Sequence, residues 1–171
     1  MDDHQKPHRE GDLPAAIEEN GNKTWFAHGK PWREGDRPHR ESSNGRVFWL
    51  DDDQKVHREG DLPAFIDENG TKTWFRHGTP WREGGRPHRE RLTGMVIWLD
   101  DDQKAHREGD LPAAIDKDGT KTWFRHGKPW REGDRPHREF LNGTVVWLDD
   151  DENAHRENDL PAVIDSNGVK A

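Results

Sequence analysis

The chain has no cysteine, no tyrosine and no long apolar run. Without cysteine, a disulfide framework and a thiolate metal site are both excluded. No stretch of about 18 apolar residues is present, so no helix is expected to cross a membrane. The first residues also lack the apolar core of a signal peptide. These absences predict a protein of the cytoplasm that does not insert into membranes.

Aliphatic residues are scarce, and positive charge does not dominate. Leu, Ile, Val and Phe together make 27 of the 171 residues, which is below the roughly 20% under which a chain of high net charge is usually disordered. The formal net charge of -8 argues against a nucleic-acid partner, because phosphates need a basic face. Disorder is nevertheless not expected, since disordered chains are poor in aromatics and this one has nine tryptophans.

The sequence repeats with a period of 49 residues. The motif HRE begins at His8, His57, His106 and His155, and residues 57–105 and 106–154 are identical at 38 of 49 positions. Within each period, HREGDLPA is echoed about 24 residues later by WREGDRPH. One repeat domain, 1–171, is therefore predicted, with units near 8–31, 32–56, 57–80, 81–105, 106–129 and 130–154 and a partial unit at 155–171.

Each unit reads as a β-hairpin. In PAFIDENGTKTWF, Asn69-Gly70 favours a type I′ turn, which would place Phe65 opposite Trp74. The same register places arginines opposite tryptophans in the sister units, as Arg40–Trp49, Arg89–Trp98 and Arg138–Trp147. The predicted fold is all-β, with about seven tandem antiparallel hairpins of 24–25 residues stacked into an elongated solenoid or ribbon. A closed propeller is the alternative, although three and a half four-stranded blades fall short of the usual four.

Alternation along the strands predicts a buried face. It carries Ala64 and Ile66 from the first strand of a hairpin, and these pairs from the second strands: Thr73/Phe75, Phe48/Leu50, Ile97/Leu99 and Val146/Leu148. The opposite face carries a ladder of tryptophans at 24- to 25-residue steps.

The motifs WFRHGTPW and HREGDLPA resemble the variant MORN-type repeats of bacterial, phage and large-virus proteins. The matching positions are Trp74, Phe75, Gly78, His106, Arg107, Glu108, Pro112 and Ala113, with their copies. The resemblance covers essentially the whole chain. It implies stacked antiparallel hairpins in a twisted ribbon that serves as a scaffold or interaction surface. The absence of tyrosine, and GDLPA in place of DGPA, depart from the usual pattern.

Metal and cofactor sites are not expected. The HRE histidines and glutamates do not form a four-ligand set, and we expect His and Arg to pack on the next unit while Glu meets a neighbouring Arg. The aspartate triplets favour turns stabilised by side-chain hydrogen bonds. The alternative is calcium binding through Asp51, Asp53, Asp100, Asp102, Asp149 and Asp151.

The tryptophans are the main candidates for ligand contact. The candidate binding residues are the ladder, with the arginines facing it: Trp25, Trp49, Trp74, Trp98, Trp123, Trp147, Arg40, Arg89 and Arg138. A structural ladder buried under the loops is favoured, because the chain is poor in aliphatic residues. If the ladder is exposed, its Trp and Asp side chains suit a carbohydrate.

The repetition argues against an enzyme. A catalytic centre is normally one asymmetric constellation, whereas every candidate residue here occurs at least three times. The predicted function is a non-enzymatic scaffold or protein-interaction module, with carbohydrate binding and calcium binding as alternatives. The hairpin at 155–171 lacks most of its second strand. This predicts a protein partner or self-association there, with a two-fold homodimer as the specific form.

Overall fold

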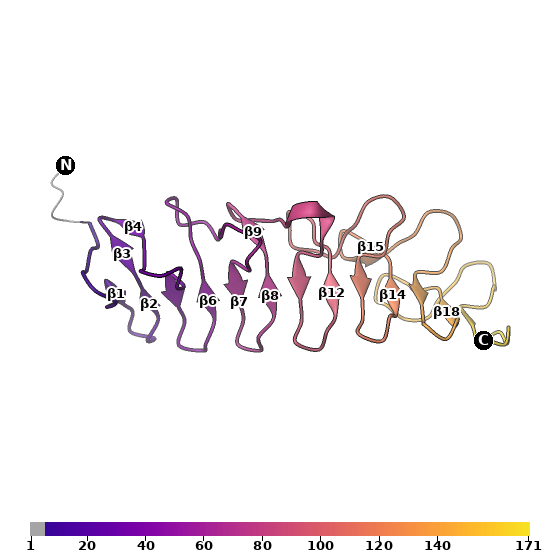
Figure 1. Cartoon of the computed structure of the whole chain (residues 1–171). Helices are drawn as coiled ribbons and strands as arrows, with labels where there is room; N and C mark the ends of the chain where they lie inside the picture. The colour runs from indigo at the N-terminus through magenta and orange to yellow at the C-terminus, as the bar shows by residue number, and fades with distance from the viewer. Residues whose placement is uncertain (1–5) are drawn as a thin grey trace. The chain divides into compact units, whose positions relative to one another are not determined.

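A computed structural model of the chain describes residues 6–171 and shows an all-β protein (Figure 1). Apart from one 3-10 helix, η2 (Glu83–Gly85), its regular elements are short antiparallel strands. The chain forms two compact units, unit 1 (Met1–Gly85) and unit 2 (Arg86–Ala171).

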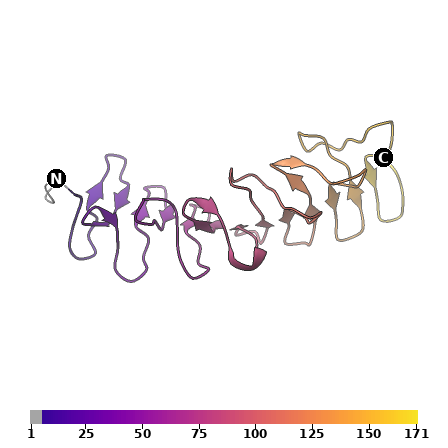
Figure 2. The same ribbon diagram turned by 90° about the horizontal axis from the view of Figure 1, so that it is seen from above.

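In each unit the hairpin strands pair in sequence order, as Figure 2 shows from above. Unit 1 contains β1 (Ala16–Ile17), β2 (Lys23–Thr24), β5 (Arg40–Glu41), β6 (Val47–Phe48), β7 (Phe65–Ile66) and β8 (Lys72–Thr73). Unit 2 contains β11 (Arg89–Glu90), β12 (Val96–Ile97), β13 (Ala114–Ile115), β14 (Lys121–Thr122), β17 (Arg138–Glu139), β18 (Val145–Val146) and β19 (Val163–Ile164). The prediction of tandem antiparallel hairpins is confirmed. The pairing runs on past four strands in both units, which a propeller blade would not allow.

The predicted hairpin register is wrong by one residue. Phe65 pairs with Thr73, and Ile66 pairs with Lys72, so Trp74 does not face Phe65. The arginines predicted to face tryptophans are shifted in the same way, in the pairs Arg40–Phe48, Arg89–Ile97 and Arg138–Val146.

The turn type explains the shift. Gly70 has a φ of 76°, while Asn69 is not in the left-handed region, so the two positive φ angles of a type I′ turn are absent. The Gly70 N–H instead donates to the Asp67 carbonyl at 3.0 Å, and the Asp67 N–H donates to that of Thr71 at 3.0 Å. This is a three-residue loop in which a type I turn is followed by a glycine bulge. One extra loop residue moves every cross-strand pair by one position.

Type I′ turns do occur, but in short ribbons that the sequence analysis missed. These ribbons are β3 (Phe26–Ala27) with β4 (Lys30–Pro31), β9 (Phe75–Arg76) with β10 (Thr79–Pro80), and β15 (Phe124–Arg125) with β16 (Lys128–Pro129). In β9–β10 the two loop residues are His77 and Gly78, with φ angles of 50° and 87°. Figure 1 shows the ribbons at the hairpin ends opposite the turn tips.

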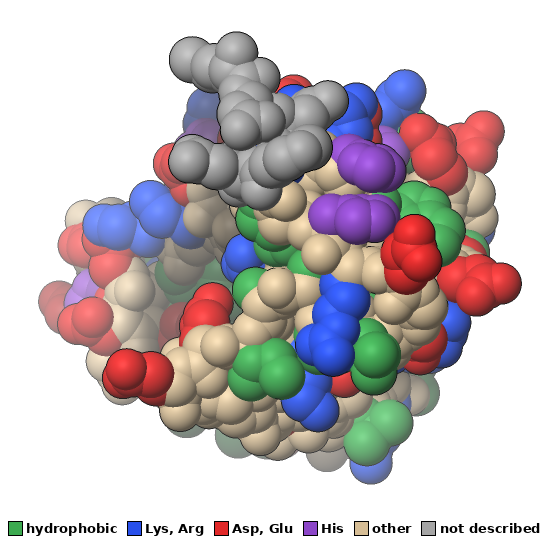
Figure 3. Space-filling model, turned by 90° about the vertical axis from the view of Figure 1, so that its left-hand side faces the viewer, with side chains coloured by type: hydrophobic (Ala, Val, Ile, Leu, Met, Phe, Trp, Pro, Cys, Tyr) green, Lys and Arg blue, Asp and Glu red, His purple; other side chains and the backbone are tan. Residues whose placement is uncertain are grey.

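The core combines the predicted buried face with the tryptophans. Ala64 and Thr73 are fully buried, and of the predicted set Phe75, Leu50, Ile97, Leu99, Val146 and Leu148 are also buried, while Phe48 and Ile66 are half-buried. The chain turns directly after Trp25, Trp74 and Trp123 into a ribbon, and directly after Trp49, Trp98 and Trp147 into an aspartate turn. Figure 3, seen from the N-terminal end, shows hydrophobic side chains only in small patches between charged ones.

Candidate functional site

The ladder tryptophans are interior side chains. Trp25, Trp49, Trp74, Trp123 and Trp147 are at most 7% exposed, and Trp98 is half-buried. The expectation that the ladder is structural is therefore confirmed for these five. A sugar ring cannot stack on these five indoles, because they are already covered.

An arginine from the following 24- to 25-residue repeat covers each of these indoles. Arg58 lies over Trp49 with its Cζ 3.8 Å from the ring centroid, donates to the Pro63 carbonyl at 3.1 Å, and pairs with Asp36 at 2.9 Å. The Trp49 indole N–H donates to the Asp36 carbonyl at 3.0 Å. We call this arrangement the Trp–Arg–Asp clamp. It joins three segments that lie about 10 to 20 residues apart in the sequence.

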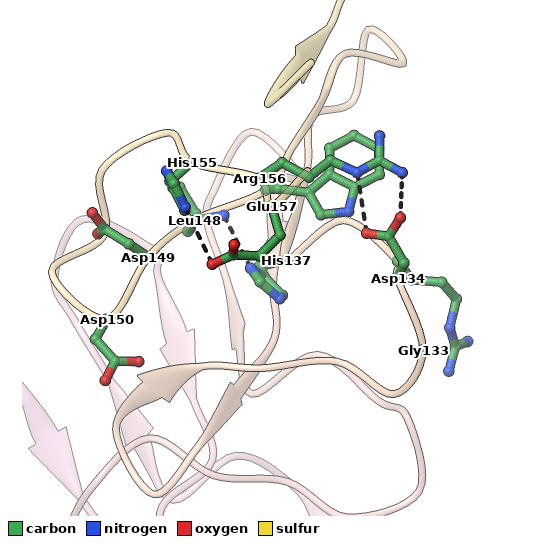
Figure 4. A pocket seen from close by; sticks show the side chains of 11 residues that line it. Gly133, Asp134, His137, Leu148, Asp149, Asp150, His155, Arg156 and Glu157 are labelled. Carbon is green, nitrogen blue, oxygen red and sulfur yellow. Dashed lines mark hydrogen bonds and ion pairs between the residues drawn. The ribbon is translucent and has the colours of Figure 1, made fainter. Parts of the chain in front are cut away.

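The arginine over the indole and its pairing with an aspartate recur in both units, although the buried indole N–H groups of Trp25 and Trp147 have no hydrogen-bond partner among residues 6–171. Figure 4 shows the copy in which Arg156 reaches Asp134, with 2.6 Å between Nη2 and Oδ2. The side-chain hydrogen bond from Arg156 holds the pKa of Asp134 below its usual value. The remaining copies that include an aspartate are Trp25–Arg33–Asp12, Trp74–Arg82–Asp61 and Trp123–Arg131–Asp110.

Arg107 covers Trp98 at 3.8 Å and donates to the Pro112 carbonyl at 3.4 Å, but it has no carboxylate partner among residues 6–171. Burial lowers its pKa.

The arginines that contact the ladder are therefore not the ones predicted. Arg40 and Arg138 begin β5 and β17, and both are half-buried. Arg138 donates to Thr122 Oγ1 at 3.3 Å and pairs with Glu152 at 3.0 Å. Arg89 begins β11 and is half-buried as well. The true partners could have been recognised, because each lies in an HRE or WRE motif that continues with Gly or Asn. Arg40, Arg89 and Arg138 lie in HRE motifs that continue with Ser, Arg or Phe.

The HRE histidines form stacked pairs with the ribbon histidines. His57 lies on His77 with 4.2 Å between ring centroids, and His8–His28 and His106–His126 repeat this at 4.3 Å. The His57 Nδ1 accepts the His77 backbone N–H at 3.3 Å, so its proton is on Nε2, which donates to Glu59 at 3.0 Å. Glu59 therefore meets its own histidine and not the neighbouring arginine that was expected. The expected pairing with an arginine is found in two other HRE motifs, where Glu41 pairs with Arg33 and Glu139 with Arg131, each at 2.5 Å.

The first aspartate of each triplet is the acceptor of a turn. Asp51 Oδ1 accepts the backbone N–H groups of Asp53 and Lys55 at 3.0 and 2.9 Å, and Oδ2 lies 2.7 Å from Nδ1 of His77. Burial alone would raise the pKa of Asp51, but the hydrogen bonds from His77, Lys55 and Asp53 lower it. Asp149 accepts from Asp151 and Asn153 in the same way.

The other predicted calcium ligands are placed as follows. Asp100 accepts the Lys104 N–H at 2.9 Å, and Asp53, Asp102 and Asp151 are exposed. Among residues 6–171, no group of three or more His, Asp or Glu side chains is arranged to hold a metal ion.

The second set of tryptophans is exposed. Trp32, Trp81 and Trp130 are 50, 43 and 42% exposed, and the leucines of the preceding GDLPA motifs, Leu13, Leu62 and Leu111, are 41–52% exposed. In the sequence, this second set stands out only by its 49-residue spacing. Each of these tryptophans directly follows the Gly-x-Pro of a ribbon, and this motif could have distinguished them from the ladder tryptophans.

Trp81 and Trp130 each line a groove. The unit 1 groove is formed by His57, Arg58, Glu59, Gly60, Asp61, Leu62, Trp74, Phe75, Arg76, Trp81 and Glu83. The unit 2 groove is formed by the eleven residues 49 positions later, His106 to Leu111, Trp123 to Arg125, Trp130 and Glu132. The grooves hold about 130 and 370 Å³. We call them the tryptophan grooves.

Unit 2 also contains a hollow that is lined by a different set of residues. It holds about 550 Å³ and is lined by the Trp147 clamp, His137, His155, Glu157 and the Asp149–Asp150 turn (Figure 4). Its only indole belongs to Trp147, which is buried. This hollow therefore presents polar groups and no exposed aromatic face.

No family model, curated protein or solved structure matches the chain. Among residues 6–171, no helix is long and apolar enough to span a membrane.

Proposed function

We propose that this chain is a non-enzymatic scaffold that binds other proteins through its tryptophan grooves. The observation that carries the proposal is the recurrence of one groove, with the same eleven residue positions, in both units. A repeated contact site suits a binding array, whereas catalysis normally needs one asymmetric set of groups.

The exposed residues in the grooves support a protein partner. Trp81 and Leu62 expose about two fifths of their surface within one groove, as do Trp130 and Leu111. Large apolar side chains at such positions act as anchors in protein interfaces.

We also propose that the repeats are of the MORN type. The protein is proposed to work in the cytoplasm, because a chain without cysteine suits a reducing compartment.

Capture from a lysate of the source cells tests this function. The wild-type chain and the W81A/W130A variant are immobilised in equal amounts, and the retained proteins are quantified by mass spectrometry. We expect a set of proteins that the wild type retains and the variant loses. L92A/L141A is the control, because Leu92 and Leu141 are 82 and 81% exposed in the hairpin turns, outside both grooves. Equal retention by wild type and W81A/W130A would contradict the proposal.

A further inference from the structure

We propose that each tryptophan groove binds an extended peptide segment that contains proline and arginine. This inference rests on the proposed protein-binding function and adds the chemistry of the ligand. It accounts for three kinds of group that occur together in both grooves: an apolar pair, hydrogen-bond donors without acceptors, and exposed carboxylates.

The apolar pair fits a proline ring. Trp81 and Leu62 line the same groove and remain 43 and 41% exposed, and Trp130 and Leu111 repeat the pair at 42 and 47%. A flat indole beside a branched aliphatic side chain offers a narrow apolar slot. Proline-rich segments dock in aromatic-lined grooves of this kind, and their stiff backbone loses little entropy on binding.

The donors fit the carbonyl groups of an extended backbone. The indole N–H groups of Trp81 and Trp130 make no hydrogen bond within residues 6–171, whereas those of Trp74 and Trp123 donate to backbone carbonyls at 3.0 and 3.1 Å. Arg76 lies over Trp81 at 5.0 Å from the ring centroid and makes no ion pair in the described part of the chain. A polyproline helix has no internal hydrogen bonds, so its carbonyls are free to accept from such donors.

Arg125 repeats this arrangement in unit 2. It lies 4.8 Å from the Trp130 ring centroid and also has no carboxylate partner among residues 6–171. The arginines of the clamps, by comparison, lie 3.7 to 3.8 Å from their indoles. The groove arginines therefore lie farther from their indoles than the clamp arginines do, and their N–H groups are available to a ligand.

The carboxylates select a basic ligand. Glu59 and Glu108 line the two grooves with side chains that are 87 and 89% exposed, and each accepts only a histidine Nε2–H. The chain as a whole carries a formal charge of -8. An arginine of the peptide can pair with the glutamate in bidentate geometry, and its guanidinium can also stack on the indole.

Fluorescence anisotropy with a synthetic peptide tests the inference. The probe is a labelled peptide of alternating proline and arginine, about ten residues long, enough for about three turns of a polyproline helix. We expect W81A/W130A to weaken its binding at least about tenfold, because it removes the aromatic anchor from both grooves. L62A/L111A should also weaken binding, whereas the matched L92A/L141A variant should bind as the wild type does. Circular dichroism confirms that each variant is folded.

The ligand chemistry is tested by changing the probe. Replacing every arginine of the peptide by glutamate should abolish binding, and raising the salt concentration should weaken binding of the original peptide. The inference is overturned if the wild type does not bind the peptide, if the glutamate peptide binds equally well, or if W81A/W130A binds like the wild type. Binding of a neutral glucose oligosaccharide, lost in W81A/W130A, would instead make the grooves glycan sites.

The lysate experiment separates the two proposals. If the peptide fails but lysate proteins still depend on Trp81 and Trp130, the grooves bind proteins of another chemistry and only this inference is wrong. If both experiments fail, the protein-binding function is wrong as well.

Discussion

At the scale of single residues, the nine tryptophans fall into two environments. An indole such as that of Trp74 is held on one face by Arg82 at 3.7 Å, and its N–H donates to the Asp61 carbonyl. Trp81 is seven positions later, and its backbone N–H donates to the Trp74 carbonyl at 3.2 Å, but its side chain remains 43% exposed. The same residue type is therefore core at one position and exposed surface at the other.

This difference predicts unequal costs of truncation. Trp74→Ala should lower the free energy of unfolding by about 3–5 kcal/mol, because it leaves a cavity and removes the indole from its clamp. Trp81→Ala should cost less than about 1 kcal/mol, as is usual for exposed side chains. Urea titration followed by circular dichroism measures both. A cost at Trp81 as large as that at Trp74 would mean that the groove tryptophans are structural.

Two half-buried histidines predict a dependence of stability on pH. The Nδ1 atoms of His39 and His137 accept the N–H groups of Leu50 and Leu148 at 3.0 Å, and burial lowers the pKa of both imidazoles below the ordinary 6.5. The unfolded chain therefore takes up protons first as the pH falls. Their contribution to stability is complete above pH 6.5 and is lost as the pH falls from there towards the lowered values.

We expect the urea midpoint to fall between about pH 7.5 and pH 5, above the range where carboxylates titrate. The H39Q/H137Q variant should show a smaller fall, since glutamine accepts a hydrogen bond but does not titrate in this range. An identical fall in the variant and the wild type would assign the effect to other groups.

At the scale of the hairpin, a single glycine fixes the turn. Gly45 has a φ of 91°, and a Cβ added there would meet no atom within 4 Å. The Gly45 N–H donates to the Ser42 carbonyl at 2.9 Å and closes the same three-residue loop as in the sister hairpins. Any cost of a side chain at this position is therefore a cost of backbone conformation and not of collision.

Gly45→Ala should accordingly lower the free energy of unfolding by about 1–2 kcal/mol, because alanine disfavours positive φ. Gly45→Asn should cost less, since asparagine tolerates the left-handed region better. Chemical unfolding of the two variants side by side gives the comparison. If asparagine costs as much as alanine, the φ requirement is not the reason for glycine here.

At the scale of the whole molecule, charge is distributed as local pairs. Arg46 pairs with Glu68 and Arg156 with Asp134, each with a carboxylate from a neighbouring unit of the repeat. In the aspartate turns, Asp51 and Asp149 each use Oδ1 to accept two backbone N–H groups. The Asp51 Oδ2 lies 2.7 Å from Nδ1 of His77. These oxygens are therefore already engaged within the protein.

Calcium should accordingly not stabilise the protein. We expect the melting temperature to be the same with a chelator and with excess calcium, once ionic strength is matched, because an ion that binds only the folded state would raise it. Differential scanning calorimetry measures this. A rise with calcium that magnesium does not reproduce would restore the calcium alternative.

The sequence alone determined the repeat, the strand class and the identity of the buried face. The 49-residue period, the turn glycines and the alternating apolar positions are local signals, and each survives in the structure. They also predicted that the tryptophan ladder is structural, since so few aliphatic side chains are available to fill a core.

Tertiary structure decided the register, the partners of the ladder and the site. Asn-Gly is compatible with a two-residue or a three-residue loop, and the choice depends on how the strands on both sides pair with their neighbours. Whether a tryptophan is buried depends on which arginine reaches it from the next 24- to 25-residue repeat, as Arg82 reaches Trp74. Leu62 and Trp81 lie in one groove because folding brings the GDLPA loop to the β9–β10 ribbon, and no local pattern of residues encodes that distance.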